Sequence, residues 1–427
     1  MSEKILLRGG RVVDPSQSLD ANVDVLLAAG VIASVGESLD APENAKVVDC
    51  GGLIVTPGLI DVHVHLREPG GEHKETIATG AASAAAGGFT AICAMPNTDP
   101  PIDDQATVGY VVAQGKAAGF SKVYPVGCIS EGREGKRLAL VGEMVDAGAV
   151  AITDDGSPVM DSGLMRLALE YSQTFNIPVA DHPEDLTLTA AGHMNEGIVS
   201  ARLGLTGKPN AGEDIHIVRD LLLAELTGGH IHLQHISTAH GVEAIRQAKA
   251  RGVRVTAEAS PHHLVLTHEA VEGYRTEAKM NPPLRRPEDV DAVRAGLADG
   301  TLDTIATDHA PHHYDEKEAA FADAPNGIVG LETAIGVVMT RVVAEGVIDL
   351  SAMVERMSCQ PARAFNLAGG TLAEGGVADV TVLDPTETWT VDAKTFLSKS
   401  GNTPFGGWEL TGRPRMTIVD GRVVWSS

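Results

Sequence analysis

The chain has 427 residues, 43% of them hydrophobic and 21% charged, which is ordinary for a globular protein long enough for one large barrel or two or three smaller domains. Its 33 basic and 57 acidic residues leave a formal net charge of −24, which argues against nucleic acid or an anionic membrane surface as a partner. The four cysteines form no CxxC pair, the first residues lack a signal-peptide pattern, and no apolar run is long enough to span a bilayer, so we expect a cytoplasmic protein without disulfides.

Both ends of the chain are rich in short β-branched runs. Glycine and Asn or Asp turn residues separate the runs near the start, and Asp420-Gly421 gives a hairpin signal near the end. No central segment shares this spacing. We therefore expect residues 1–56 and 366–427 to form the two parts of one small β-sandwich domain.

The middle of the chain alternates between strand-like and helix-like segments. Each strand-like run is short and apolar, and a helix-like stretch follows it. The runs lie at residues 59–65, 90–96, 122–128, 149–155, 177–182, 230–237, 253–260 and 304–311. Eight strand-then-helix units predict a parallel (β/α)8, TIM-like barrel, which we place at residues 57–365.

Side chains that bind metals stand at the ends of five of these runs. They are His63 and His65 on the first, Asp154 and Asp155 on the fourth, His182 on the fifth, His235 on the sixth and Asp308 on the eighth. Taken singly, each could be a capped or solvated side chain or a turn residue. Because the carboxyl ends of parallel barrel strands meet at one face, the set together predicts a metal centre there.

Strand alternation predicts which of these side chains face inward. On the first strand, it places His63 and His65 on one face and Ile60, Val62 and Val64 on the other.

On the fourth strand, Val150 and Ile152 share a face with Asp154. Bulky apolar residues suit the helix-facing side of a barrel strand, so Asp155 is the predicted ligand. The histidines that precede His235 on its strand, His230 and His232, have the opposite parity, and we expect them near the start of that strand.

Four histidines and two carboxylates exceed what one tetrahedral zinc ion takes, which suggests two metals that share a carboxylate. Imidazole and carboxylate ligands without cysteine fit zinc, and manganese or cobalt remain alternatives. Such a pair lowers the pKa of a water molecule, so the predicted chemistry is metal-assisted hydrolysis at a carbonyl, or its reverse.

In sequence, the chain resembles the amidohydrolase superfamily and, most closely, the class I dihydroorotases. The resemblance covers essentially the whole chain and rests on motifs that occur in order. They are "PGLIDVHVHLREPG", "AMPNTDP", "TDDG", "ADHPED", "QHIS", "SPHHL", "KMNPPLR" and "TDHAPH". The resemblance implies a reversible, metal-dependent cyclisation of N-carbamoyl-L-aspartate to L-dihydroorotate in de novo pyrimidine (UMP) biosynthesis.

The resemblance also implies residue roles. Two Zn²⁺ ions per subunit are expected, one held by His63, His65 and Asp308 and the other by His182 and His235. Asp155 would bridge the ions together with a hydroxide, and Asp308 would act as general acid and base. The residues expected to contact substrate are His65, Arg67, Asn97, Asn281, His312, Asn326 and Gly327. Relatives usually carry an aromatic residue where this chain has Asn326, which weakens that one assignment.

Two other functions remain open. A hydantoinase or allantoinase would keep the metals, but such enzymes usually bridge them with a carboxylated lysine where this chain has Asp155. An inert barrel that serves aspartate transcarbamoylase as a structural subunit would be expected to have lost ligands. The resemblance further implies a homodimer and permits association with aspartate transcarbamoylase.

Overall fold

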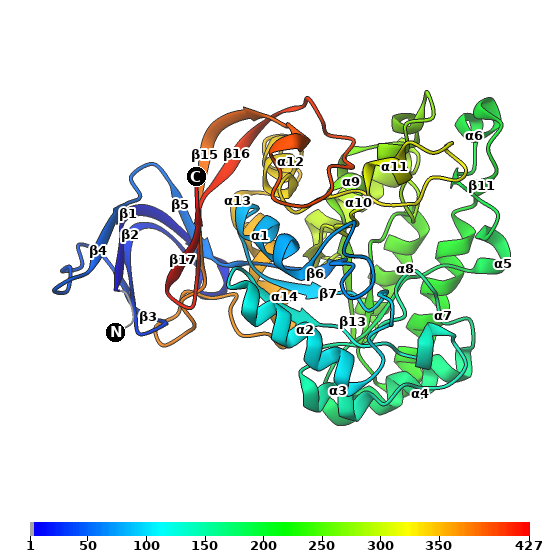
Figure 1. Cartoon of the computed structure of the whole chain (residues 1–427), viewed down its shortest axis with the longest axis horizontal. Coiled ribbons are helices and arrows are strands. Elements are labelled where there is room, and N and C mark those ends of the chain that lie inside the picture. Colours follow the sequence, from blue (N-terminus) through cyan, green and yellow to red (C-terminus); the bar gives the residue numbers. More distant parts are fainter. Residues whose placement is uncertain (1–3) are drawn as a thin grey trace.

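The computed structural model describes residues 4–427, and strands from both ends of the chain lie together on one side of a barrel (Figure 1). They form an eight-stranded sheet in the order β17-β16-β15-β5-β1-β2-β3, with β4 paired to β1. The strands are β1 (Ile5–Asp14), β2 (Leu19–Ala28), β3 (Val31–Gly36), β4 (Lys46–Asp49), β5 (Ile54–Pro57), β15 (Val380–Thr390), β16 (Glu409–Val419) and β17 (Arg422–Ser426). The prediction that the two chain ends pair is confirmed.

The sheet branches at β1. Its first residues pair in parallel with β4, and Arg11 and Val12 pair in parallel with β5. A register shift between Leu7 and Gly10 separates the two halves, and a Cβ on Gly10 would lie 2.8 Å from Cγ2 of Val55. Glycine therefore lets β1 approach β5. Hydrogen bonds join the strands into one continuous sheet, and N-terminal and C-terminal strands share one hydrophobic core.

Parallel strands form the barrel in two hydrogen-bonded groups, β6-β7-β8 and β9-β12-β13-β14. They are β6 (Leu59–Val64), β7 (Phe89–Ala94), β8 (Lys122–Pro125), β9 (Val179–Asp181), β12 (Ile231–Leu233), β13 (Val255–Ala259) and β14 (Thr304–Ile305). Ile152 bridges both Gly127 and Val179, and Val64 bridges His309. These bridges connect the two groups and close the ring, as the fold prediction requires.

Several predicted strands are shorter than expected. The run at 149–155 is reduced to the bridging residue Ile152, because Pro125 and Pro178 on the flanking segments have no N–H to donate to a ladder. Strands β12 and β14 end before the predicted ligands that follow them. His235 and Asp308 have φ angles of 34° and 49°, outside the extended region that a strand needs.

The alternation predicted for the first strand is wrong in part. Ile60 and Val62 pack in one cluster with Ala306 and Phe365, whereas Val64 packs with the large core beneath the helices. The register of β6 against β7 shifts after Leu59 and again between Asp61 and Val64, so strict alternation fails there.

Helices surround the barrel (Figure 1). Several begin at a side-chain cap, such as Thr76 before α1, Asp104 before α2 and Asp161 before α4. The outer helices are α1 (Ile77–Ala86), α2 (Gln105–Ala118), α3 (Val141–Ala147), α4 (Ser162–Ser172), α7 (Ala211–Thr227), α8 (Ala239–Ala250), α10 (Pro287–Asp299), α12 (Ala334–Val338), α13 (Leu350–Val354) and α14 (Gln360–Ala364).

Short elements lie in the connections. They are α5 (Leu186–Thr189), β10 (Met194–Asn195), α6 (Ile198–Leu203), β11 (Gly207–Lys208), α9 (Pro261–Val265) and α11 (Tyr314–Lys317). Within residues 4–427, no helix combines the length and apolar character needed to cross a membrane.

Candidate metal centre and substrate pocket

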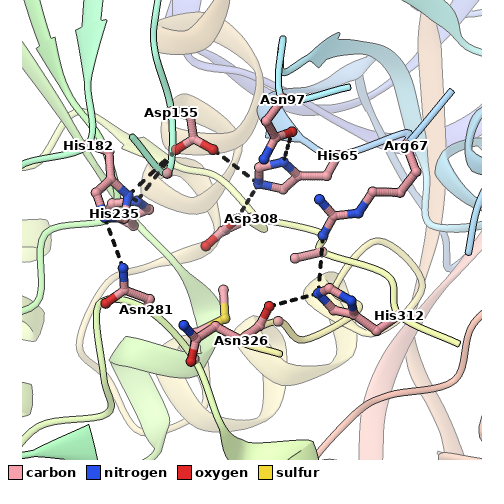
Figure 2. Close-up of a pocket in the computed structure, with 14 residues that line it drawn as sticks. His65, Arg67, Asn97, Asp155, His182, His235, Asn281, Asp308, His312 and Asn326 are labelled. Carbon is pink, nitrogen blue, oxygen red and sulfur yellow. Dashed lines mark hydrogen bonds and ion pairs between the residues drawn. The ribbon is translucent and has the colours of Figure 1, made fainter. Parts of the chain in front are cut away.

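All six predicted metal ligands meet at the carboxyl end of the barrel (Figure 2 shows five of them). His63 is the penultimate residue of β6 and His65 directly follows that strand, while His182, His235 and Asp308 follow β9, β12 and β14. Their side chains are at most 5% exposed. Parallel strand ends therefore bring together residues that lie up to 245 positions apart.

Asp155 lies at the middle of this cluster. Its Oδ1 is 3.4 Å from His63 Nε2, 3.6 Å from His182 Nδ1 and 4.0 Å from His235 Nε2. Its Oδ2 is 3.5 Å from His65 Nε2. One carboxylate oxygen thus faces the His182 and His235 side and the other faces His65, which is the orientation a bridging ligand needs.

Asp308 completes the other half of the cluster. Its Oδ1 lies 3.0 Å from His65 Nε2 and 3.5 Å from His63 Nε2. Two ligand atoms bound to one zinc at about 2.0–2.2 Å with a tetrahedral angle are roughly 3.4 Å apart. The observed separations are close to that value, and buried His63 Nε2 has no hydrogen-bond partner. The residues therefore fit metal ions.

The neighbouring aspartate points elsewhere. Asp154 Oδ1 accepts hydrogen bonds from the backbone N–H groups of Ile129 and Ser130 at 2.9 and 3.1 Å, and the Ser130 hydroxyl donates to Oδ2. Asp154 thus anchors the loop after β8, and Asp155, selected from alternation alone, is the one that faces the histidines.

The electrostatics of the cluster favour ionised carboxylates. Burial by itself would raise the pKa of Asp308, but His63 and His65 outweigh burial and lower that pKa to about 2. The same balance, with His63 and His182 as the main neighbours, holds the pKa of Asp155 well below its usual range. Both side chains are therefore held in the anionic form that binds cations.

Buried oxygens orient three of the four imidazoles. His63 Nδ1 donates to Glu258 Oε1 at 2.5 Å, His65 Nδ1 donates to Asn97 Oδ1 at 2.8 Å, and His182 Nε2 donates to Glu184 Oε2 at 3.2 Å. Each such bond lies on the outer side of its ring, so the other ring nitrogen faces the cluster, where His65 Nε2 is 3.0 Å from Asp308 Oδ1 and His182 Nδ1 is 2.8 Å from His235 Nε2.

Glu258 is a further functional residue that the sequence did not predict. It is fully buried in β13, where it also accepts from the His235 backbone N–H at 3.0 Å and from His232 Nε2 at 3.1 Å. His232 is therefore part of the network that supports the cluster. The available signal was a lone charged residue in the strand-like run "VRVTAEAS".

Three residues at the site have positive φ angles although they are not glycine. They are Arg67 at 61°, His235 at 34° and Asp308 at 49°. Such backbone strain costs of order 1–3 kcal/mol per residue and persists where the surrounding structure enforces it. Two of these residues are predicted ligands, and the third directs its side chain toward the pocket.

A pocket of about 190 Å³ opens over the cluster (Figure 2). All seven residues predicted to contact substrate line it, together with Gly156, Met280 and Ala310, which sequence analysis did not single out. A Cβ on Gly327 would lie 2.5 Å from the Ala310 carbonyl oxygen, so glycine is required there. Asn326 turns its backbone carbonyl toward His312, whose Nε2 donates to it at 2.8 Å.

Arg67 is the cation of this pocket. Its Nε donates to the Pro311 carbonyl at 3.1 Å, and one Nη lies 3.4 Å from His312 Nε2. Burial lowers the pKa of Arg67 to about 10, which still leaves it charged at neutral pH. Within residues 4–427, no carboxylate forms an ion pair with it at 4 Å or less, so the guanidinium can receive an anion.

A separate group of metal-ligating residue types lies apart from the pocket and consists of Asp181, His216 and Asp220. Arg219 enters it, with one Nη 2.7 Å from Asp220 Oδ1 and the other donating to His216 Nε2 at 3.1 Å. A guanidinium already supplies the positive charge there, so this cluster is a structural ion-pair network.

Two family profiles match successive, slightly overlapping parts of the chain. The dihydro-orotase-like family profile matches residues 52–241, and an amidohydrolase family profile matches residues 224–425. The dihydroorotase of Citrifermentans bemidjiense is 54% identical over 99% of this chain and 100% of its own length. The chain belongs to the dihydroorotase family. The dihydroorotase of Pelobacter propionicus is 53% identical over 99% of both chains.

Solved structures extend the likeness to other cyclic amidohydrolases. The L-hydantoinase (dihydropyrimidinase) from Arthrobacter aurescens superposes with a TM-score of 0.88 at 28% identity and covers 99% of this chain and 96% of its own. The D-hydantoinase from a Thermus species gives a TM-score of 0.82 at 27% identity, with 98% and 94% covered. The amidohydrolase fold of this dihydroorotase family member is thus shared over nearly its whole length.

Proposed function

We propose that the chain catalyses the reversible cyclisation of N-carbamoyl-L-aspartate to L-dihydroorotate, a step of pyrimidine biosynthesis. The observation that carries this proposal is the half-buried Arg67 guanidinium, which has no carboxylate partner within residues 4–427 and lines the same pocket as the His/Asp cluster. N-carbamoyl-L-aspartate and L-dihydroorotate both carry a carboxylate that such a guanidinium binds well. Near-full-length relatives named dihydroorotase support the assignment.

In this proposal two Zn²⁺ ions occupy the cluster. His63, His65 and Asp308 would hold one, His182 and His235 would hold the other, and Asp155 would be shared between them. When bound, the metal pair lowers the pKa of a water molecule and polarises the carbonyl that reacts. The ligand set contains nitrogen and oxygen but no sulfur, which suits zinc and also admits manganese or cobalt.

The pocket residues would orient the substrate. Arg67 and the Asn97 amide would bind its carboxylate, with Asn97 also holding the His65 ring through Oδ1. His312, Asn281 and the backbone of Asn326 and Gly327 would contact the remainder of the ring. Orientation of this kind lowers the barrier by holding the reacting atoms in register.

Asp308 would move the proton. It is ionised in the resting cluster, so in the hydrolytic direction it can accept a proton from the attacking water. The C–O bond forms, the ring C–N bond breaks, and Asp308 returns the same proton to the departing ring nitrogen. In the biosynthetic direction the carbamoyl nitrogen attacks the side-chain carboxyl carbon, Asp308 takes a proton from that nitrogen and passes it to the departing hydroxyl oxygen, and one water leaves.

A hydantoinase-like hydrolysis of another cyclic ureide is the second candidate, because the hydantoinase structures share the fold. Asp155 stands where many such relatives use a carboxylated lysine, which favours dihydroorotate. An inert structural role fits less well, because all six ligand-type side chains are present and meet.

We also propose that the protein is a cytoplasmic homodimer. A chain with net charge −24 repels its own copies, so an interface between copies needs an uncharged surface. Helix α7 carries one, with Ile215, Val218, Leu222 and Leu226 spaced along one face and 46–64% exposed. A monomeric Leu222→Glu variant beside a dimeric parent would support this interface, and association with aspartate transcarbamoylase would appear as a larger species on mixing.

The deciding experiment measures dihydroorotate formation from N-carbamoyl-L-aspartate by zinc-loaded protein, with hydantoin and allantoin assayed in parallel and Asp308→Ala as control. Turnover confined to the pyrimidine precursor and lost in the variant is the expected result. Turnover of another ureide alone would support the second candidate, hydantoinase-like hydrolysis. No turnover of any of the three substrates, with metal bound, would favour a structural role.

A further inference from the structure

Two buried lysines surround the loop that brings Asn326 and Gly327 to the pocket. Lys279 lies just before the pocket residues Met280 and Asn281, and Lys317 ends α11. Their side chains are 4% and 5% exposed. Neither ammonium group forms an ion pair within the described part of the chain, which is unusual because a buried charge is normally matched by an opposite one.

Backbone carbonyls take the place of a counter-ion. Lys279 Nζ donates to the carbonyls of Phe321 and Ala324 at 2.6 Å and to that of Ala322 at 3.0 Å. Lys317 Nζ donates to the carbonyls of Pro325 and Gly327 at 2.9 and 3.0 Å.

The two lysines together satisfy carbonyls at five of the seven positions 321–327. This segment contains neither helix nor strand. It has no regular hydrogen-bond ladder of its own. The lysine bonds hold it together with the Asn402 side-chain amide, which donates to the Gly327 carbonyl at 3.0 Å, and with local turn bonds to the Ala320 carbonyl.

Segment 321–327 ends in the pocket. Gly327 N–H donates back to the Lys279 carbonyl at 2.9 Å, which ties the segment to the residues before Asn281. The carbonyl of Asn326, between the two that Lys317 binds, is the one that accepts from His312 Nε2 (Figure 2). The position of these pocket atoms therefore depends on the two ammonium groups.

We propose that Lys279 and Lys317 are positioning residues that set substrate affinity by holding segment 321–327 through its backbone carbonyls. The substrate in this inference is that of the proposed function, but the effect of the two lysines on the segment does not depend on that function. The chemical step belongs to the His/Asp cluster, which neither lysine touches. Burial, with Lys279 as a like-charged neighbour, lowers the pKa of Lys317 to about 7. A neutral amine still donates two hydrogen bonds, so both protonation states can hold the two carbonyls.

The test compares Lys317→Met, which keeps the chain length and removes every donor, with Lys317→Gln, which keeps two donors. Lys394→Met is the matched control, because Lys394 is an exposed lysine at a neighbouring cavity that Lys317 also lines. Hydrogen exchange of residues 318–328 reports on the segment itself. Kinetics with N-carbamoyl-L-aspartate report on KM and kcat, and bound metal is counted in each variant.

For Lys317→Met we expect at least tenfold faster exchange in the segment, a KM raised at least tenfold, and kcat and metal content within threefold of the parent. Lys317→Gln should fall between Lys317→Met and the parent, and Lys394→Met should match the parent. Unchanged exchange, or a loss in kcat with KM unchanged, would overturn the proposal. If Lys317→Met does not fold, Lys317→Gln must show a raised KM. An unchanged KM in Lys317→Gln would then overturn the proposal. If the parent does not turn over N-carbamoyl-L-aspartate, the proposed function is wrong. The hydrogen-exchange result would still test whether the two lysines hold segment 321–327.

Discussion

Glu258 offers the sharpest test of how the metal cluster is held. It accepts three hydrogen bonds, from His63 Nδ1, the His235 backbone and His232 Nε2, and it is fully buried. Replacement by alanine would leave three buried donors unsatisfied at about 1–3 kcal/mol each, a sum comparable with the whole stability of a domain. Glu258→Gln is therefore the informative change.

The glutamine oxygen can keep the two bonds that Oε1 now accepts. Its amide nitrogen then faces His232 Nε2, and His232 can adapt by moving its proton to Nδ1, which lies 2.8 Å from the Thr256 hydroxyl. What is lost is the charge on the acceptor of the His63 bond. Hydrogen bonds to charged groups are worth about 1 kcal/mol more than neutral ones, and removing such a partner of a metal ligand lowers metal affinity by about 10–100-fold.

The assay is equilibrium dialysis of the variant and the parent against graded free zinc, with bound metal counted per chain and kcat/KM measured at saturating zinc. We expect the zinc titration of Glu258→Gln to move to 10–100-fold higher concentration while the protein remains folded. Glu243→Gln, at an exposed position on α8, should titrate as the parent does. Equal zinc affinity of Glu258→Gln and the parent would refute the reasoning that this carboxylate orients His63.

Four further outcomes are expected. Asp155→Asn should lose metal and activity, whereas Asp154→Asn should keep metal and lose about 1–2 kcal/mol of stability in urea unfolding, because Asp154 only anchors the loop after β8. Arg67→Lys should raise KM about 10–100-fold with kcat nearly unchanged in steady-state assays, since lysine cannot bind a carboxylate through two parallel N–H groups. Burial raises the pKa of Glu332 to about 7, so the stability that its protonated form contributes is lost as pH rises from about 5 to above 7. Between pH 5 and 8.5, the free energy of unfolding of Glu332→Gln in urea should therefore rise by up to about 3 kcal/mol relative to that of the parent. Removal of metal by a chelator should abolish activity, and zinc should restore it.

The metal cluster is where expectations from the sequence and the folded geometry agree best. Metal-ligating residues at successive strand ends predicted one centre, since parallel strands in a barrel must end on one face. The alternation of strand side chains predicted Asp155, and not Asp154, as the inward-facing residue. The rule applies on this segment because the chain stays extended around Ile152. The same rule failed for Ile60 and Val62, where irregular register in β6 breaks the period of two.

Local periodicity and contiguous motifs in the sequence predict the fold class, the ligand-type residues and seven of the residues that line the pocket. The contacts that support those residues depend on the tertiary structure. Glu258 contacts His63 from 195 positions away, and Lys279 and Lys317 contact the same segment from the connections that follow β13 and β14. Such contacts leave no local pattern: any buried polar group needs a partner, but which one it finds depends on how the barrel closes.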